Sequence, residues 1–342
     1  MSRKLLSYTA IGLILGSTAI ADVPKVAVDI APVHSLVARV MDGVGSPKLV
    51  IPAGASPHEY SLRPSEAKSL QDADMVIWIG EDLAPWMENS IETLSKNAEV
   101  ITLLKESETK LLEFREGALF EEHDHGDHDD HGDHEDHDDH DDHDHDKDHD
   151  DHDDHDDHDD HDDHGDHDGH AHGEHDPHAW LSIENAQTWL NLVAGKLSAA
   201  DPENAGVYFA NAAAAREEIN DLVKEVNSIL EPVRGRNFVV FHDAYQYFET
   251  SFNFPAAGAI SLGDATDPSA ARIAEIQGRV KDEGINCVLS EPQYNANLVA
   301  TVLSGTDAKT GVIDPLGLGL EPGPKLYGDL IRNMAKALAG CL

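Results

Sequence analysis

Short apolar runs alternate with longer helix-like stretches along this chain, and this alternation limits the folds it can adopt. Up to about residue 103 the apolar runs are KVAVDI, PKLVIP, MVIWIG and AEVITL, and the stretches between them have helical spacing. Strands that are apolar along their whole length are buried on both faces, which is typical of parallel sheets covered by helices. The first part of the chain is therefore predicted to form a parallel α/β lobe.

The same alternation returns in the last third of the chain. The runs NFVVFHD, AAGAISL, INCVLS and TGVID fit strands, and AYQYFETSF, residues 267–284 and residues 324–340 fit helices. This pattern predicts a second parallel α/β lobe.

Two helices are expected between these sets, at residues 183–199 and 201–231. Asp201 is suited to cap the second one, with Pro202 at its first helical position. Its apolar residues recur with helical spacing at Ile219, Leu222, Val223, Val226, Ile229 and Leu230. We expect an α/β protein of two (β/α) lobes with parallel sheets, residues 22–200 and 232–342, joined by one long connecting helix, residues 201–231.

The N-terminus, MSRKLLSYTAIGLILGSTAIA, has a basic start, an apolar centre and an end of small residues. These are the marks of a secretory signal peptide, residues 1–21, cleaved before Asp22. A membrane anchor is the alternative, although the apolar part is shorter than the roughly 18 residues that usually span a bilayer. The segment contains no cysteine, so we expect an exported chain that is not lipidated.

The two cysteines, Cys287 and Cys341, favour one disulfide, because an even pair in an exported protein is normally oxidised. That bond would tie the C-terminus to the strand INCVLS. Two free thiols are the alternative.

The net charge of −42 is concentrated in one segment, residues 121–176, which holds 30 acidic residues and a single lysine. Nucleic acid and anionic membranes are not expected partners, because both require clustered Lys and Arg. Residues 123–169 contain nothing apolar, so burial cannot offset their ordering entropy, and we expect a disordered surface insertion.

The insertion is also rich in histidine, and flexible Asp/His repeats can hold divalent cations weakly. We expect it to collect metal at low affinity; a solvated spacer that binds metal incidentally is the alternative. Its candidate ligands are His123, His125, His128, His131, His134, His137, His140, His143, His145, His149, His152, His155, His158, His161, His164, His167, His170, His172 and His175.

Four histidines lie outside this tract, and three of them stand where a strand has ended or a helix begins: His58, His178 and His242. Asp314 ends another predicted strand. Ligands collect beyond the carboxyl ends of parallel strands, so these residues can meet in one cleft between the lobes. Three imidazoles and a carboxylate suit Zn²⁺, whereas Mn²⁺ favours more oxygen donors.

Each of these residues also has a purely structural reading when taken alone. Glu59 could supply an oxygen ligand in place of Asp314, or it could hold a neighbouring side chain. For His34, which follows a proline at a helix start, we favour a structural role.

The segments GASPHEYSLRPS, DPHAWLS, VVFHDAYQYF, SEPQ and DPLG occur in this order along the chain. In these motifs the chain resembles the ZnuA-type proteins, the periplasmic zinc-binding components of zinc ABC transporters. The resemblance covers nearly the whole mature chain. It implies two lobes joined by a long helix, a histidine-rich insertion, and a disulfide at Cys287 and Cys341.

The same resemblance implies a ligand set of His58, His178, His242 and Asp314. Manganese-binding relatives tend to carry Glu at the position of His242, which favours zinc here. Some zinc-binding members have an acidic residue directly before the first histidine, where this chain has Pro57. Asp314, Glu59 and a water molecule are therefore the alternatives for the fourth ligand.

These observations predict a carrier that captures zinc in the periplasm and delivers it to a membrane permease. We expect a monomer that moves little on metal release, mostly in the loops bearing His58 and His178; a periplasmic zinc chaperone is a further possible partner. The alternatives are a carrier of manganese or another divalent metal, a passive metal buffer or adhesin, and a zinc-dependent hydrolase. An enzyme is not expected, because the chain has no HExxH, no GxSxG and no phosphate-binding glycine loop.

Overall fold

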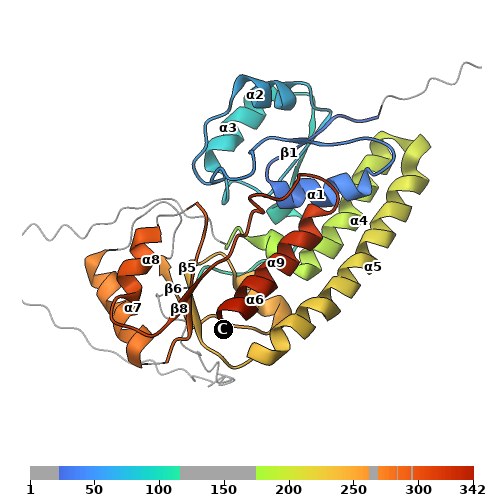
Figure 1. Cartoon of the computed structure of the whole chain (residues 1–342). Coiled ribbons are helices and arrows are strands. Elements are labelled where there is room, and N and C mark those ends of the chain that lie inside the picture. Colours follow the sequence, from blue (N-terminus) through green and yellow to red (C-terminus); the bar gives the residue numbers. More distant parts are fainter. Residues whose placement is uncertain (1–22, 116–174, 262–268, 283, 294–295) are drawn as a thin grey trace, which may run out of the picture. The chain divides into compact units, whose positions relative to one another are not determined.

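The computed structural model describes residues 23–115, 175–261, 269–282, 284–293 and 296–342, which all belong to one compact unit (Figure 1). The predicted signal peptide lies outside these residues. So do all the histidines of the Asp/His tract except His175. Among the described residues, no helix is both long and apolar enough to cross a membrane.

The first lobe is built on a parallel sheet with the strand order β2-β1-β3-β4. Every residue of β1 and β3 is buried, as the continuous apolar runs predict. The strands are β1 (Val26–Val28), β2 (Lys48–Leu49), β3 (Met75–Trp78) and β4 (Glu99–Thr102), and the helices are α1 (Ala31–Val40), α2 (Pro64–Gln71) and α3 (Pro85–Leu94).

The second lobe repeats this topology in a parallel sheet of order β6-β5-β7-β8. Its strands are β5 (Phe238–His242), β6 (Gly258–Ser261), β7 (Cys287–Ser290) and β8 (Lys309–Val312). Its helices are α6 (Gln246–Phe252), α7 (Ala270–Asp282), α8 (Ala296–Leu303) and α9 (Leu326–Cys341). Helix α8 is not predicted from the sequence; its eight residues are too few to show a clear helical period.

In each sheet the chain starts in an inner strand, goes to one edge, and then returns to the other side of that inner strand. The point where the strand order reverses lies between β1 and β3 in the first lobe and between β5 and β7 in the second. Loops leave in opposite directions there, and the opening between them is the usual ligand site of such sheets. The fold therefore offers one candidate site at the carboxyl edge of each sheet.

Two long helices follow the first lobe, α4 (Ile183–Ala200) and α5 (Ala205–Leu230), and they run side by side (Figure 1); α5 connects to the second lobe. Ser182 caps α4 by accepting a hydrogen bond from the Asn185 N–H. The connecting helix begins at Ala205 and not at residue 201, because a 3₁₀ turn at Pro202–Asn204 comes first. The predicted lobe boundaries at residues 200 and 232 stay a prediction.

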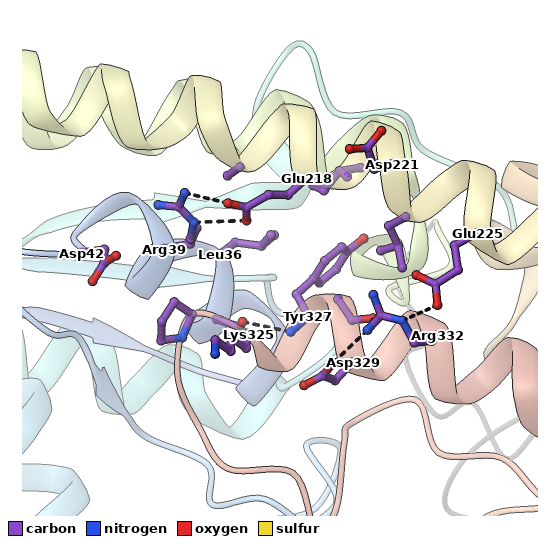
Figure 2. A pocket seen from close by; sticks show the side chains of 16 residues that line it. Leu36, Arg39, Asp42, Glu218, Asp221, Glu225, Lys325, Tyr327, Asp329 and Arg332 are labelled. Atoms are coloured by element: carbon purple, nitrogen blue, oxygen red, sulfur yellow. Dashed lines mark hydrogen bonds and ion pairs between the residues drawn. The ribbon is translucent and has the colours of Figure 1, made fainter.

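Helix α5 packs against α1 from the first lobe and α9 from the end of the chain. A groove of about 600 Å³ lies between these three helices, and ion pairs cross it (Figure 2). Arg39 on α1 binds Glu218 through two hydrogen bonds, and Arg332 on α9 binds Glu225. Inside the groove, the backbone N–H of the buried Tyr327 donates to Ser35 Oγ on α1.

The predicted disulfide is present between Cys287, at the start of β7, and Cys341, at the end of α9, with a Cα–Cα distance of 5.7 Å. The bond is packed closely against β8. A Cβ at Gly311 would lie 3.2 Å from Cys341 Cβ and 2.9 Å from Leu289 Cδ2, so only glycine fits without a shift of its neighbours. The disulfide thereby fixes the last helix to the second sheet.

Candidate metal centre

His242 is the last residue of β5, so it stands at the reversal point of the second sheet. Glu291 follows the end of the neighbouring strand β7. The two side chains are both buried, and His242 Nδ1 lies 3.2 Å from Glu291 Oε1. A carboxylate at Nδ1 favours the tautomer with the proton there, which directs the Nε2 lone pair away from Glu291.

His178 is held in the same way by Asp176, two residues earlier in the turn that leads to α4. Asp176 Oδ1 lies 2.7 Å from His178 Nδ1 and also accepts a hydrogen bond from the His178 backbone N–H at 2.9 Å. Both residues are almost fully buried. The ring therefore has one orientation, set by its own segment.

His58 comes from the long loop between β2 and α2 and is only half-buried. Trp86 fixes this loop, since its indole N–H donates to the Pro57 carbonyl at 2.8 Å. Beyond the histidine, Tyr60 OH and the Arg63 N–H both donate to the Glu66 carboxylate at the start of α2. These contacts lead the loop directly into a capped helix.

The structure brings the three histidines together. Each offers one ring nitrogen, and these atoms all lie within 4.8 Å of one another. The ring centroids are 4.8 Å apart for His178 and His242, 5.6 Å for His58 and His178, and 6.2 Å for His58 and His242. They line a cavity of about 20 Å³, room for a single ion or water molecule. Three converging imidazoles can bind one divalent metal ion at Zn–N distances of about 2.0–2.1 Å.

The carboxylates named from the sequence do not line this cavity. Asp314 accepts hydrogen bonds from the Leu316 and Gly317 N–H groups at 2.9 and 3.0 Å, so its Oδ1 stabilises the turn after β8. Glu59 is exposed. The fourth ligand therefore stays a prediction, and the cavity instead contains Glu291 and Gln293 in its wall.

His34 has the structural environment that we favour for it. It lies buried on α1, where His34 Nε2 is 3.2 Å from the Pro47 carbonyl, and it is not part of the three-histidine group. Burial lowers its pKa, so the ring is neutral at pH 7.

The described segments before and after the Asp/His tract contact each other close to this centre. Glu113 and His175 form an isolated antiparallel bridge, and the Asp176 N–H donates to the Leu112 carbonyl at 2.9 Å. Arg115 binds the carboxylates of Asp243 and Glu249. The described residues on the two sides of the tract are thus joined, one side three residues before His178 and the other through Arg115 to Asp243, the residue that follows His242.

The reversal point of the first sheet is closed by a carboxyl group of its own. Asp29 follows β1 and is fully buried; the Ile30 and Ile79 N–H groups donate to its two oxygens, each at 2.7 Å. Burial raises the pKa of Asp29 to about 7. Asp29 therefore occupies the reversal point of the first sheet, and the histidine from the first lobe, His58, comes from the loop after β2.

The family described as zinc-uptake complex component A, periplasmic (ZnuA), matches residues 26–341. The chain belongs to this family. A Paracoccus denitrificans ZnuA, a high-affinity zinc uptake system protein, is 47% identical over 332 residues, covering 96% of this chain and 95% of that protein. The Brucella abortus (strain 2308) ZnuA is 46% identical over 327 residues, covering 96% and 94%.

Solved ZnuA structures share the fold. The crystal structure of a zinc-bound ZnuA deletion mutant matches with a TM-score of 0.68 at 19% identity, covering 94% of this chain and 98% of that one. Such a match supports the two parallel α/β lobes and the long helix between them.

Sequence reasoning missed three residues around the centre: Asp176, Glu291 and Gln293. Their signals were nonetheless present. Asp176 stands two residues before a histidine in DPH, and SEPQ directly follows a strand whose end meets the end of β5. Only the register of the sheet shows that Glu291 faces His242.

Proposed function

We propose that this ZnuA family member captures a zinc ion with His58, His178 and His242 and delivers it to the permease of a zinc ABC transporter. The observation that carries the proposal is the convergence of three histidines from three distant segments on one small cavity. Two of the rings have a carboxylate at Nδ1, the arrangement that orients histidine ligands in metal sites.

The donor set favours zinc over manganese. Imidazole suits Zn²⁺, whereas Mn²⁺ prefers several carboxylate or water oxygens. In the part of the chain that the structure describes, the cluster holds three imidazoles and no carboxylate. A manganese carrier on this fold would show a manganese affinity at least equal to the zinc affinity in a competition assay.

The proposal is tested by the variants His58→Ala and His242→Ala. Each should weaken zinc binding by orders of magnitude, because loss of one of three protein ligands leaves an incomplete site. Competition with a strong chelator measures the tight site alone and excludes weak binding elsewhere. His34→Gln is the matched control, since His34 lies outside the cluster; equal zinc affinity in all four proteins would refute the proposal.

The proposal also includes export of the protein to the periplasm and binding to the transporter permease. Residues 1–21 act as a signal peptide, and the mature protein works in the periplasm as a monomer. A family of transport components supports a carrier and not a hydrolase. Turnover of a generic ester or phosphoester that stops on chelation would favour the hydrolase, and normal growth at low zinc without the gene would favour a passive buffer.

We also propose that the Asp/His tract collects zinc for the folded site. Its support is the Glu113–His175 bridge and the Asp176–Leu112 hydrogen bond, which join the described segments before and after the tract just ahead of His178. A tether of this kind turns transfer into an intramolecular step with a high effective concentration. The individual sites of the tract should be weak, because no single geometry is fixed.

Deletion of residues 123–172 tests whether the tract binds zinc weakly while the folded site binds it tightly. The deletion keeps the Glu113–His175 bridge. The deletion should leave one tight zinc per molecule and remove the weaker ones, as calorimetric titration would show. Replacement of the tract by a Gly/Ser linker of equal length is the control for chain connectivity. Loss of the tight site on deletion would contradict the proposal.

A further inference from the structure

The cavity between the three histidines has a second polar group in its wall, the side-chain amide of Gln293. Both amide atoms are buried, and neither has a hydrogen-bond partner among the residues that the structure describes. A buried amide without partners is costly, so such a group in a native fold normally has a water or an ion to bind. The amide therefore points to a ligand in the cavity.

Two carboxylates close to the cavity each have one oxygen engaged by another group, and a third carboxylate lies outside the cavity wall. Glu291 Oε1 is taken up by His242 Nδ1, and Asp314 Oδ1 accepts two backbone N–H bonds. Glu59 is exposed and is not part of the cavity wall. Gln293 differs from these carboxylates because its amide oxygen is fully buried and has no partner among the described residues.

We propose that Gln293 completes the metal centre, with its amide oxygen binding the ion directly or through one water molecule. The inference rests on the proposed zinc site and names the group at its fourth position. The donor set is then three imidazoles and a neutral oxygen. Because no carboxylate binds the ion, the site offers little to Mn²⁺ and discriminates in favour of Zn²⁺.

Three variants of the full-length protein test the assignment, each compared with wild type by chelator competition for zinc and for manganese. Gln293→Ala should weaken zinc binding about 10–100-fold, as is usual when a group that supports a metal site is lost. Gln293→Glu should narrow the ratio of zinc to manganese affinity, since it places a carboxylate at the ion. Gln277→Ala should match wild type, because Gln277 lies on α7 and binds the Thr301 carbonyl.

Two further variants address the rival ligands. Glu59→Gln should leave zinc binding unchanged, and so should Asp314→Asn, which keeps an acceptor for the turn after β8 but removes the charge. X-ray absorption of the zinc-bound wild type should show three imidazole nitrogens and one oxygen. Thermal unfolding of the metal-free Gln293→Ala protein should match wild type, which separates loss of affinity from loss of fold.

The outcomes distinguish this inference from the proposed function. Tight zinc binding by wild type, together with an unchanged affinity in Gln293→Ala, would overturn the role of Gln293 and leave the three-histidine site intact. A large loss in Glu59→Gln or Asp314→Asn would overturn it as well. If the wild-type protein itself fails to bind zinc, both the proposed function and the role of Gln293 are refuted.

Discussion

At the residue scale, two of the three proposed zinc ligands have a carboxylate at the ring nitrogen Nδ1. Asp176 fixes His178 and Glu291 fixes His242, each by a contact to Nδ1. A histidine held in this way loses little freedom on metal binding and keeps the required tautomer. We therefore expect both carboxylates to act as positioning residues for the metal site.

Asp176→Ala tests this expectation. The variant should bind zinc about 10–100-fold more weakly, because the His178 ring loses its orientation. Asp176→Asn keeps an acceptor oxygen and should recover part of the affinity. Chelator competition measures both, and Glu184→Gln at the exposed start of α4 is the control. Wild-type affinity in Asp176→Ala would mean that the turn alone orients the ring.

The buried carboxyl group of Asp29 leads to a prediction about how the free energy of unfolding depends on pH. Burial raises its folded pKa to about 7 from 3.8, so between these pH values the folded state keeps a proton that the unfolded state has lost. Stability from this group is therefore full below about pH 4 and is lost as pH rises to about 7. The loss is on the order of 4 kcal/mol for a shift of this size.

The variant Asp29→Asn cannot titrate and should not show this loss. Urea unfolding of the metal-free proteins should give a free-energy difference, variant minus wild type, that grows as pH rises from about 4 to about 7. The comparison cancels the histidines, which titrate equally in both proteins. A difference that is constant across this range would show that Asp29 is ionised in the fold.

At the element scale, the disulfide and the carboxylate that contacts His242 stand at opposite ends of one strand. Cys287 begins β7, whereas Glu291 follows its other end. The bond closes a loop of 54 residues between β7 and α9. The disulfide that fixes the last helix is therefore separated, by the length of β7, from the residues around the proposed metal site.

The double variant Cys287→Ser/Cys341→Ser should lose about 4 kcal/mol of unfolding free energy by the loop-entropy estimate. Its zinc affinity should match wild type if it is measured under conditions where both proteins are folded. Wild type with a reductant is the second test and should reach the same stability. A weaker zinc site in the folded double variant would show that the disulfide also shapes the carboxyl end of β7.

At the scale of the whole molecule, α5 joins the lobes without the freedom of a flexible hinge. It packs along α1, α4 and α9, and ion pairs join it to the first and last of these (Figure 2). The exposed ion pairs contribute little by themselves. The buried packing of three helices on the connector is what resists a rotation of one lobe.

We therefore expect zinc release to leave the lobes in place and to change mainly the loops that carry His58 and His178. Metal-free and zinc-bound crystals, or small-angle scattering of both forms, would measure this. The variant His58→Ala with and without zinc is the control for unspecific metal effects. A lobe rotation as large as in hinged sugar-binding proteins would contradict the prediction.

Much of this protein is determined by the sequence alone. Continuous apolar runs and helical periods are local signals, so they predict both parallel sheets and the long helices. The even cysteine count in an exported chain predicts the disulfide. His58, His178 and His242 stand where a predicted strand has ended or a predicted helix begins. Because the ends of parallel strands gather at one edge of a sheet, the sequence also predicts that these three residues meet. The eight-residue helix α8 and the late start of α5 are missed, because short elements and 3₁₀ turns carry weak periodic signals.

The tertiary structure alone decided which polar groups surround the cavity between the three histidines. Asp314 has the right residue type and the right place at a strand end, yet two backbone N–H groups occupy its Oδ1. Glu291 and Gln293 line the cavity because β7 pairs with β5 in a register that brings their ends together. Hydrogen bonds between distant strands set these positions, and no local pattern in the chain records them.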